Sequence, residues 1–60
     1  MTFYAGQSVR CVHAIGSYLE KGAVYTVNRF SEEDEENDEA AYLTLREIKG
    51  AFDPVRFEPA

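Results

Sequence analysis

Three short stretches of the chain alternate between apolar and polar residues, and this alternation constrains the fold more than any other feature. Residues 8–14, 23–30 and 42–48 are rich in the β-branched and aromatic side chains that strands favour. Glycine-containing turns at Lys21-Gly22 and Lys49-Gly50 separate them from their neighbours in the chain. The pattern predicts short strands that share one interior.

The alternation also predicts which side chains face that interior. In a strand, every second side chain points to the same face of the sheet. Isolated apolar residues in the connections, Leu19, Phe52 and Phe57, are expected to fill the ends of the core. The residues predicted to share a strand face are Val9, Cys11 and His13, then Tyr25 and Val27, then Leu43 and Leu45, and His13 is expected to have one side exposed.

The last ten residues contain signals for a turn and a closing strand. Asp53-Pro54 predicts a turn or a single helical turn, because proline fixes φ and suits a first helical position. Residues 55–58 are expected to form a short strand, with Pro59 ending its pairing. Together the patterns predict an all-β fold, a small barrel of four to five short antiparallel strands formed by a single domain over residues 1–60.

The size and composition of the chain argue against an enzyme. A domain of 60 residues buries only about 60% of the surface that its unfolded chain exposes, and has little material for a substrate pocket. The single cysteine, Cys11, excludes an internal disulfide and a cysteine-based zinc cluster. With no apolar run long enough to span a membrane and no signal-peptide pattern, we expect a cytoplasmic location.

The two residues most able to carry chemistry are better explained structurally. His13 is the only histidine, and no spacing of Cys, His and Asp residues supports a metal site. Cys11 alternates with Val9 and is expected to be a small buried hydrophobe rather than a nucleophile. We therefore predict no catalytic residues, no metal and no cofactor.

Charge is distributed unevenly along the chain. The net charge of −5 conceals seven acidic residues and no base within residues 32–39, while the rest of the chain carries six bases and four acids. Like charges repel, so residues 31–41 are expected to form a long, hydrated loop between the second and third strands. Such a loop can attract a basic partner surface, or it can act only as a solvated segment that aids solubility. Capture of Ca²⁺ or Mg²⁺ is a weaker alternative, because the segment lacks the glycine of a calcium loop.

Two sequence patterns resemble known families. Gly6-Gln7-x-Val9-x-Cys11 followed by Lys21-Gly22-x-x-Tyr25-x-Val27 resembles the opening hairpin of SH3-like barrels and, more loosely, the KOW-type pattern. The whole layout, with Tyr42-Leu43-x-Leu45 and the terminal Arg56-Phe57-Glu58-Pro59, resembles short proteins of unknown function from tailed bacteriophages and prophages. The resemblance implies an SH3-like fold and an accessory protein that binds, and in some cases inhibits, a host protein in the bacterial cytoplasm.

The leading hypothesis is therefore a protein-binding module whose partner is a host protein with a basic surface. The acidic loop would steer the encounter, and aromatic and arginine side chains would provide specific contacts, as they do in many interfaces. A nucleic-acid-binding small barrel is the alternative, although the bases are scattered and the acidic loop opposes phosphate. A minor virion or assembly component is a third hypothesis. The residues predicted to bind the partner are Glu32, Glu33, Asp34, Glu35, Glu36, Tyr42, Tyr18 and Arg46.

Overall fold

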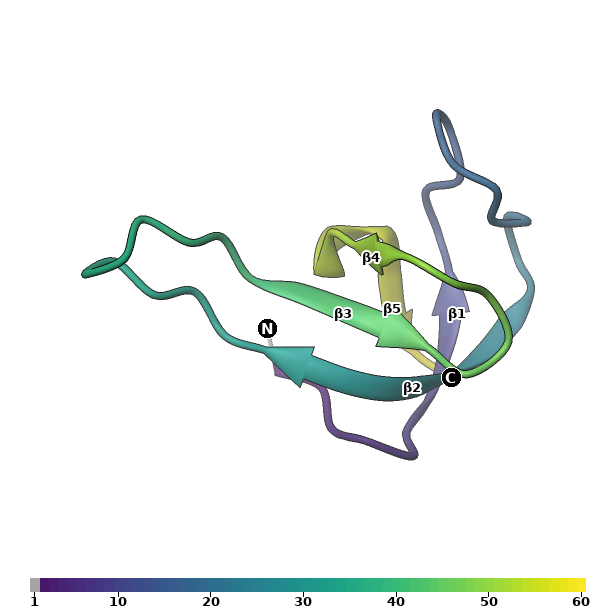
Figure 1. Cartoon of the computed structure of the whole chain (residues 1–60). Helices are drawn as coiled ribbons and strands as arrows, with labels where there is room; N and C mark the ends of the chain where they lie inside the picture. Colours follow the sequence, from purple (N-terminus) through teal and green to yellow (C-terminus); the bar gives the residue numbers. More distant parts are fainter. Residues whose placement is uncertain (1) are drawn as a thin grey trace.

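The computed structural model describes residues 2–60 as five antiparallel strands (Figure 1). The strands pair in the order β4-β3-β2-β1-β5, and residues 2–60 contain one 3₁₀ turn, η1, and no α-helix. The predicted all-β class is confirmed. The elements are β1 (Ser8–Cys11), β2 (Val24–Ser31), β3 (Tyr42–Leu45), β4 (Ala51–Phe52), η1 (Pro54–Arg56) and β5 (Phe57–Pro59).

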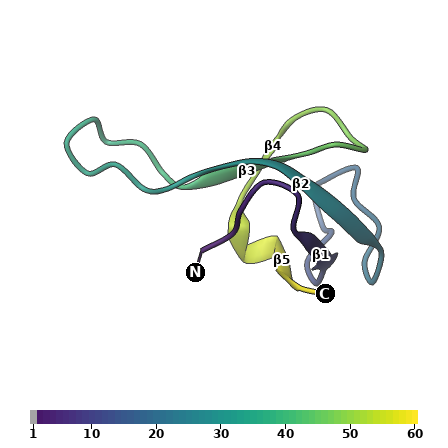
Figure 2. The same cartoon turned by 90° about the horizontal axis from the view of Figure 1, so that it is seen from below.

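Strand β2 is the longest element and takes part in two ladders. Its first half pairs with β1, with Tyr25 opposite Val9, and its second half pairs with β3, with Phe30 opposite Leu43. Strand β5 extends the sheet beyond β1, and β4 extends it beyond β3. Figure 2 shows the resulting curl, in which the N-terminal segment and β5 lie beneath the β2–β3 ribbon.

The interior is a single cluster of apolar side chains. The pairs that the alternation predicted to point inward on the second and third strands are buried, as are Val9 and Cys11 on the first. Leu19 and Phe57 are also buried, while Phe52 is half-buried with its ring 6.2 Å from that of Phe57. Burying one such side chain stabilises a fold by roughly 1.5–3 kcal/mol. The cluster consists of Phe3, Val9, Cys11, Leu19, Tyr25, Val27, Leu43, Leu45 and Phe57.

A β-bulge at Asn28 changes which residues of β2 face the core. The register shifts between Val27, which lies opposite Leu45, and Arg29, which lies opposite Thr44, and this shift leaves Asn28 as the extra residue. An extra residue reverses the alternation beyond it and bends the strand. As a result Arg29 is exposed, whereas Phe30 packs against the core.

The prediction that the first strand continues through His13 is wrong. Strand β1 ends at Cys11, and the backbone N–H groups of Val12 and His13 both donate to the carbonyl of Arg56, at 2.7 and 3.2 Å. Because the chain turns toward Arg56 at this point, the alternation is interrupted and the His13 side chain is exposed. The two hydrogen bonds to the Arg56 carbonyl therefore replace the pairing that a longer strand would make.

The closing strand is shifted from the predicted residues 55–58, because Val55 and Arg56 belong to η1 and β5 covers Phe57–Pro59. Asp53 caps η1 by accepting a hydrogen bond from the Val55 N–H at 3.1 Å, and Pro54 stands at the start of the turn, as predicted. However, Pro59 does not end the pairing, since it lies within β5 opposite Val9. Proline is tolerated there because β5 is an edge strand and its missing N–H faces away from β1.

Candidate functional site

The acidic segment forms an extension of the β2–β3 hairpin that projects clear of the sheet (Figures 1 and 2). Asp34 and Glu39 form an isolated bridge, in which each backbone N–H donates to the other residue's carbonyl at 2.9 Å. The bridge keeps the register that pairs Ser31 with Tyr42 at the base. We call residues 32–41 the acidic hairpin.

The tip of the acidic hairpin is organised by the side chain of Asp34. One carboxylate oxygen accepts a hydrogen bond from the backbone N–H of Glu36 at 3.2 Å, and the other accepts one from the side-chain amide of Asn37 at 2.8 Å. The hydrogen bond from the Asn37 side chain, together with those from backbone N–H groups, lowers the pKa of Asp34 below its ordinary value of 3.8. Asp38 completes the turn with a φ of 53°, a left-handed conformation that Asp tolerates better than most residues.

The carboxylates of the acidic hairpin have no cationic partner within residues 2–60. The single ion pair in that part of the chain joins Arg10 to Glu58, at 3.5 Å, on the β1–β5 ladder. The hairpin therefore presents unneutralised negative charge at the end of a projecting ribbon. A hollow of ≈ 250 Å³ lies between its arms, lined by Glu33, Asp34, Glu35, Asp38, Glu39 and Ala40.

The arrangement of these acids does not form a metal centre. In the part of the chain that the structure describes, no three His, Cys, Asp or Glu side chains converge so that they could hold an ion. Instead, the Asp34 carboxylate is engaged by Glu36 and Asn37. The hairpin instead presents its negative charge to the solvent.

The structure places six of the eight predicted binding residues on the acidic hairpin or at its base. Tyr42 starts β3 at the base of the acidic hairpin, where it lies opposite Ser31 and is half-buried. Asp34 is half-buried at the tip, and the other four acids are exposed. The residues gathered here are Glu32, Glu33, Asp34, Glu35, Glu36 and Tyr42.

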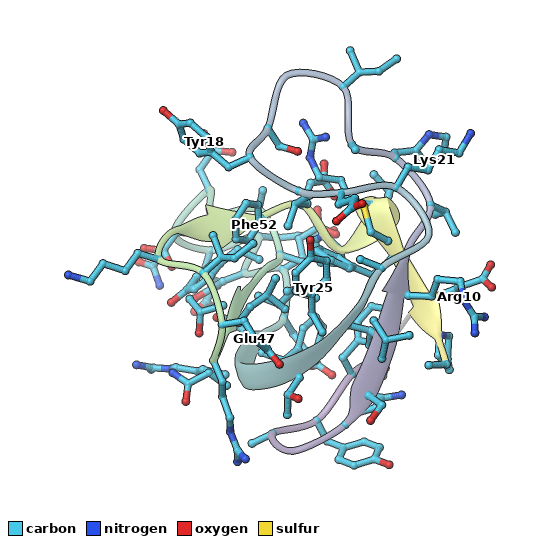
Figure 3. All side chains as sticks on the ribbon, turned by 90° about the vertical axis from the view of Figure 1, so that its right-hand side faces the viewer. Arg10, Tyr18, Lys21, Tyr25, Glu47 and Phe52 are labelled. Atoms are coloured by element: carbon cyan, nitrogen blue, oxygen red, sulfur yellow. The ribbon has the colours of Figure 1, made fainter. Side chains whose placement is uncertain are left out.

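The other two predicted binding residues lie elsewhere. Arg46 follows the opposite end of β3, four residues from Tyr42 and so about 13 Å along the strand. Tyr18 lies in the β1–β2 loop, where its side chain is 93% exposed. Figure 3 shows Tyr18 projecting from the molecule on the same side as Phe52. Sequence spacing could not reveal this separation, because it depends on how the long loops fold back.

A second concave surface, which the sequence patterns did not indicate, lies beside Tyr18. The β1–β2 loop and the β3–β4 turn enclose an open cleft of ≈ 360 Å³. The signals that could have drawn attention to it are Gly16 and Gly50, which adopt φ values of 76° and 123° and so mark tight turns on either side. The cleft is lined by Gly16, Ser17, Tyr18, Lys49, Gly50, Ala51, Phe52, Asp53 and Arg56.

We compared the chain with protein-family models, with curated proteins and with solved structures, and none of them matched it. Over residues 2–60, no helix has the length and apolar character needed to cross a bilayer. The two surfaces that bear on function are the acidic hairpin and the cleft beside Tyr18.

Proposed function

We propose that this protein is a small accessory module that binds another protein, and that its acidic hairpin docks on a basic surface of that partner. The observation that carries the proposal is the placement of seven acidic residues on a projecting hairpin with no counter-ion in residues 2–60. Apart from Asp34, which holds the tip of the hairpin, these charges repel one another without an ion pair in the part of the chain that the structure describes. They become favourable when a cationic surface approaches.

The proposed mode of binding follows from the physics of charged surfaces. Complementary charge speeds association and selects among partners more than it adds affinity. Specific affinity then needs a desolvated contact, which Tyr42 can provide from the base of the acidic hairpin, since tyrosine is enriched at the centres of interfaces. The ordered tip reduces the entropy that binding would otherwise cost, because Asp34 already holds the turn.

We also propose that the chain is an SH3-like barrel of the kind found in small phage and prophage proteins, acting on a host protein in the bacterial cytoplasm. The pairing of β1 between β2 and β5, together with a 3₁₀ turn directly before the last strand, supports this assignment. A host protein that binds nucleic acid has the kind of basic surface that the hairpin would cover. Binding there would inhibit the host protein by competing with phosphate.

Four Glu→Gln substitutions in the acidic hairpin test the proposal. Asp34 is left intact because it holds the tip, so the substituted residues are Glu32, Glu33, Glu35 and Glu36. The variant and the wild type are used as bait in a lysate of the presumed bacterial host, and captured proteins are identified by mass spectrometry. We expect one dominant, salt-sensitive partner with wild type and its loss with the variant.

A matched variant separates charge from shape. Glu→Asp at the same four positions keeps every negative charge while shortening each side chain by one methylene. We expect this variant to recover the same partner as the wild type. If the Gln variant captures that partner as well as the wild type does, the acidic hairpin is not the binding element.

Nucleic-acid binding is the second candidate, and the cleft beside Tyr18 is the observation in its favour, because it combines aromatic and cationic side chains. Electrophoretic mobility at low salt tests it with single-stranded DNA and RNA. A shift that strengthens when residues 31–41 are shortened would support this function over the first. The absence of any shift would eliminate it.

A further inference from the structure

The cleft between the β1–β2 loop and the β3–β4 turn has a rigid wall. The Arg56 guanidinium donates to the carbonyls of His13 and Ile15 at 3.1 and 2.8 Å, and so anchors the loop to η1. The Ser17 hydroxyl donates to the carbonyl of Ala14 at 2.7 Å and accepts from the Leu19 N–H at 3.2 Å. Because Leu19 is buried in the core, the loop is fixed at both ends.

This rigid loop holds apolar side chains in solvent. Ile15 is 92% exposed and Tyr18 is 93% exposed, while Val55 on the neighbouring turn is 61% exposed. Because the loop is already ordered, little entropy is lost when a partner buries these side chains.

The charge of the cleft indicates an acidic occupant. Lys49 and Arg56 line it, and the one acid among the lining residues, Asp53, is engaged in capping η1. Arg56 uses its Nη1 to hold the two loop carbonyls, which fixes its guanidinium in place, whereas Lys49 is exposed and can turn toward an incoming carboxylate. Two cations suit a carboxylate side chain better than a nucleic acid, which needs several phosphate contacts.

The chain itself contains a segment with this chemistry. The tip of the acidic hairpin carries Glu35 and Glu36, both exposed and both without an ion pair in residues 2–60. The hairpin points away from the loop and turn that form the cleft (Figure 1), so a molecule cannot insert its tip into its own cleft. A second copy can do so.

We propose that the cleft beside Tyr18 is a docking site for the acidic hairpin of a second copy of this chain. Glu35 or Glu36 of one copy would pair with Lys49 of the next, and Tyr18 would pack over the incoming tip. The contact joins two different surfaces, so each copy can dock on one neighbour and accept another, and the association can repeat from copy to copy.

The net charge of −5 does not prevent this contact at physiological salt. The molecule is 34 Å long, whereas the Debye length is about 8 Å at 0.15 M ionic strength. Charges at the far ends of two docked copies are therefore screened from each other, and the charges at the contact dominate. The contact is small, so the association is weak and salt-dependent.

The proposal does not depend on a host partner, although it uses the same hairpin as the proposed function. Sedimentation of the purified protein tests this proposal, while capture from a lysate tests the other, so either can fail alone. If both hold, a basic partner competes with self-association for the acidic hairpin.

Sedimentation equilibrium over a concentration series provides the test. At about 0.15 M salt we expect the weight-average mass to rise above 6.8 kDa with concentration, and at about 1 M salt, where the Debye length falls to about 3 Å, we expect it to return to that value. Lys49→Glu in the cleft and Glu35→Lys/Glu36→Lys at the tip should each weaken association by about tenfold or more. The tip variant is decisive. It changes the net charge from −5 to −1 and so weakens the general repulsion between copies, yet we expect association to fall.

Two controls complete the design. Lys21→Glu makes the same charge change as Lys49→Glu at an exposed residue that Figure 3 places on the other side of the loop from Tyr18, and it should leave association unchanged. Mixing the Lys49→Glu and Glu35→Lys/Glu36→Lys variants should restore association, because the opposed charges again meet. A mass of 6.8 kDa at every concentration, or association that survives Lys49→Glu, would overturn the proposal. Binding of an oligothymidylate that Lys49→Glu abolishes would instead assign the cleft to nucleic acid.

Discussion

The carboxylate of Glu47 accepts a hydrogen bond from the backbone N–H of Thr26, with distances of 2.9 and 3.0 Å to its two oxygens. Strand β3 ends at Leu45, and although the Arg46 N–H still donates to the Thr26 carbonyl at 3.0 Å, the reciprocal bond from the Thr26 N–H goes to the Glu47 side chain. The side chain takes the place of the strand. This explains why β3 stops at Leu45 although the sequence pattern predicted a strand that reaches residue 48.

We expect Glu47→Ala to lower the free energy of unfolding by about 0.5–1 kcal/mol, the value of a solvent-accessible hydrogen bond. Urea denaturation followed by far-UV circular dichroism measures the change. Glu20→Ala is the control, since Glu20 is an exposed acid whose carboxylate makes no hydrogen bond in the structure. Equal stability of the two variants would show that the contact contributes nothing.

The same contact makes stability depend on pH. The hydrogen bond from Thr26 lowers the pKa of Glu47 below its ordinary value of 4.5, so the folded state favours the ionised carboxylate. A lowered pKa contributes stability that is present above the ordinary value and is lost as the pH falls through the folded value. We therefore expect the free energy of unfolding to fall more for the wild type than for Glu47→Gln as the pH is lowered below 5. Urea titrations at each pH measure this difference. Parallel curves for the two proteins would contradict the assignment.

The bulge at Asn28 predicts unequal effects for two adjacent residues. Phe30 packs on the core with its ring centroid 5.8 Å from that of Phe3, whereas Arg29 is exposed. We expect Phe30→Ala to cost about 2 kcal/mol, less than for a fully buried phenylalanine, and Arg29→Ala to change stability by less than about 0.5 kcal/mol. Thermal unfolding measures both. A larger loss for Arg29→Ala would show that the register shift is misplaced.

The anchoring of the β1–β2 loop by Arg56 can be tested by amide hydrogen exchange. Arg56→Ala removes the donors to the carbonyls of His13 and Ile15, and we expect faster exchange at the Ser17 N–H, which donates to Ala14. The expected loss in free energy of unfolding is about 1 kcal/mol. Arg10→Ala removes the same kind of side chain from an exposed ion pair and should cost less than about 0.5 kcal/mol without affecting Ser17.

The parts of the fold that follow from local alternation could be predicted from the sequence. Tyr25 and Val27, like Leu43 and Leu45, are buried because a strand of period two places them on one face, and nothing between them interrupts the strand. The turn at Asp53-Pro54 could also be predicted, because the cap and the fixed φ act within a few residues.

The features that could not be predicted depend on contacts between distant segments. The bulge at Asn28 is decided by how β2 meets β1 on one side and β3 on the other. Similarly, His13 leaves the sheet because its N–H bonds to Arg56, 43 residues away in the chain. The separation of Tyr18 from the acidic hairpin has the same origin, because the hydrogen bonds from Arg56 set the direction of the β1–β2 loop.

The acidic hairpin is an extension of the sheet that contributes no residue to the core of residues 2–60. Replacing residues 33–40 with Asn-Gly tests this directly, because the register of the flanking pairs places residues 32 and 41 opposite each other, as a two-residue turn requires. We predict that the shortened chain folds, with the amide chemical shifts of Val9, Val27 and Leu43 unchanged and the free energy of unfolding within about 1 kcal/mol of wild type, and that it no longer captures the protein partner. A shortened chain that is unfolded, or that still captures the partner, would contradict the account.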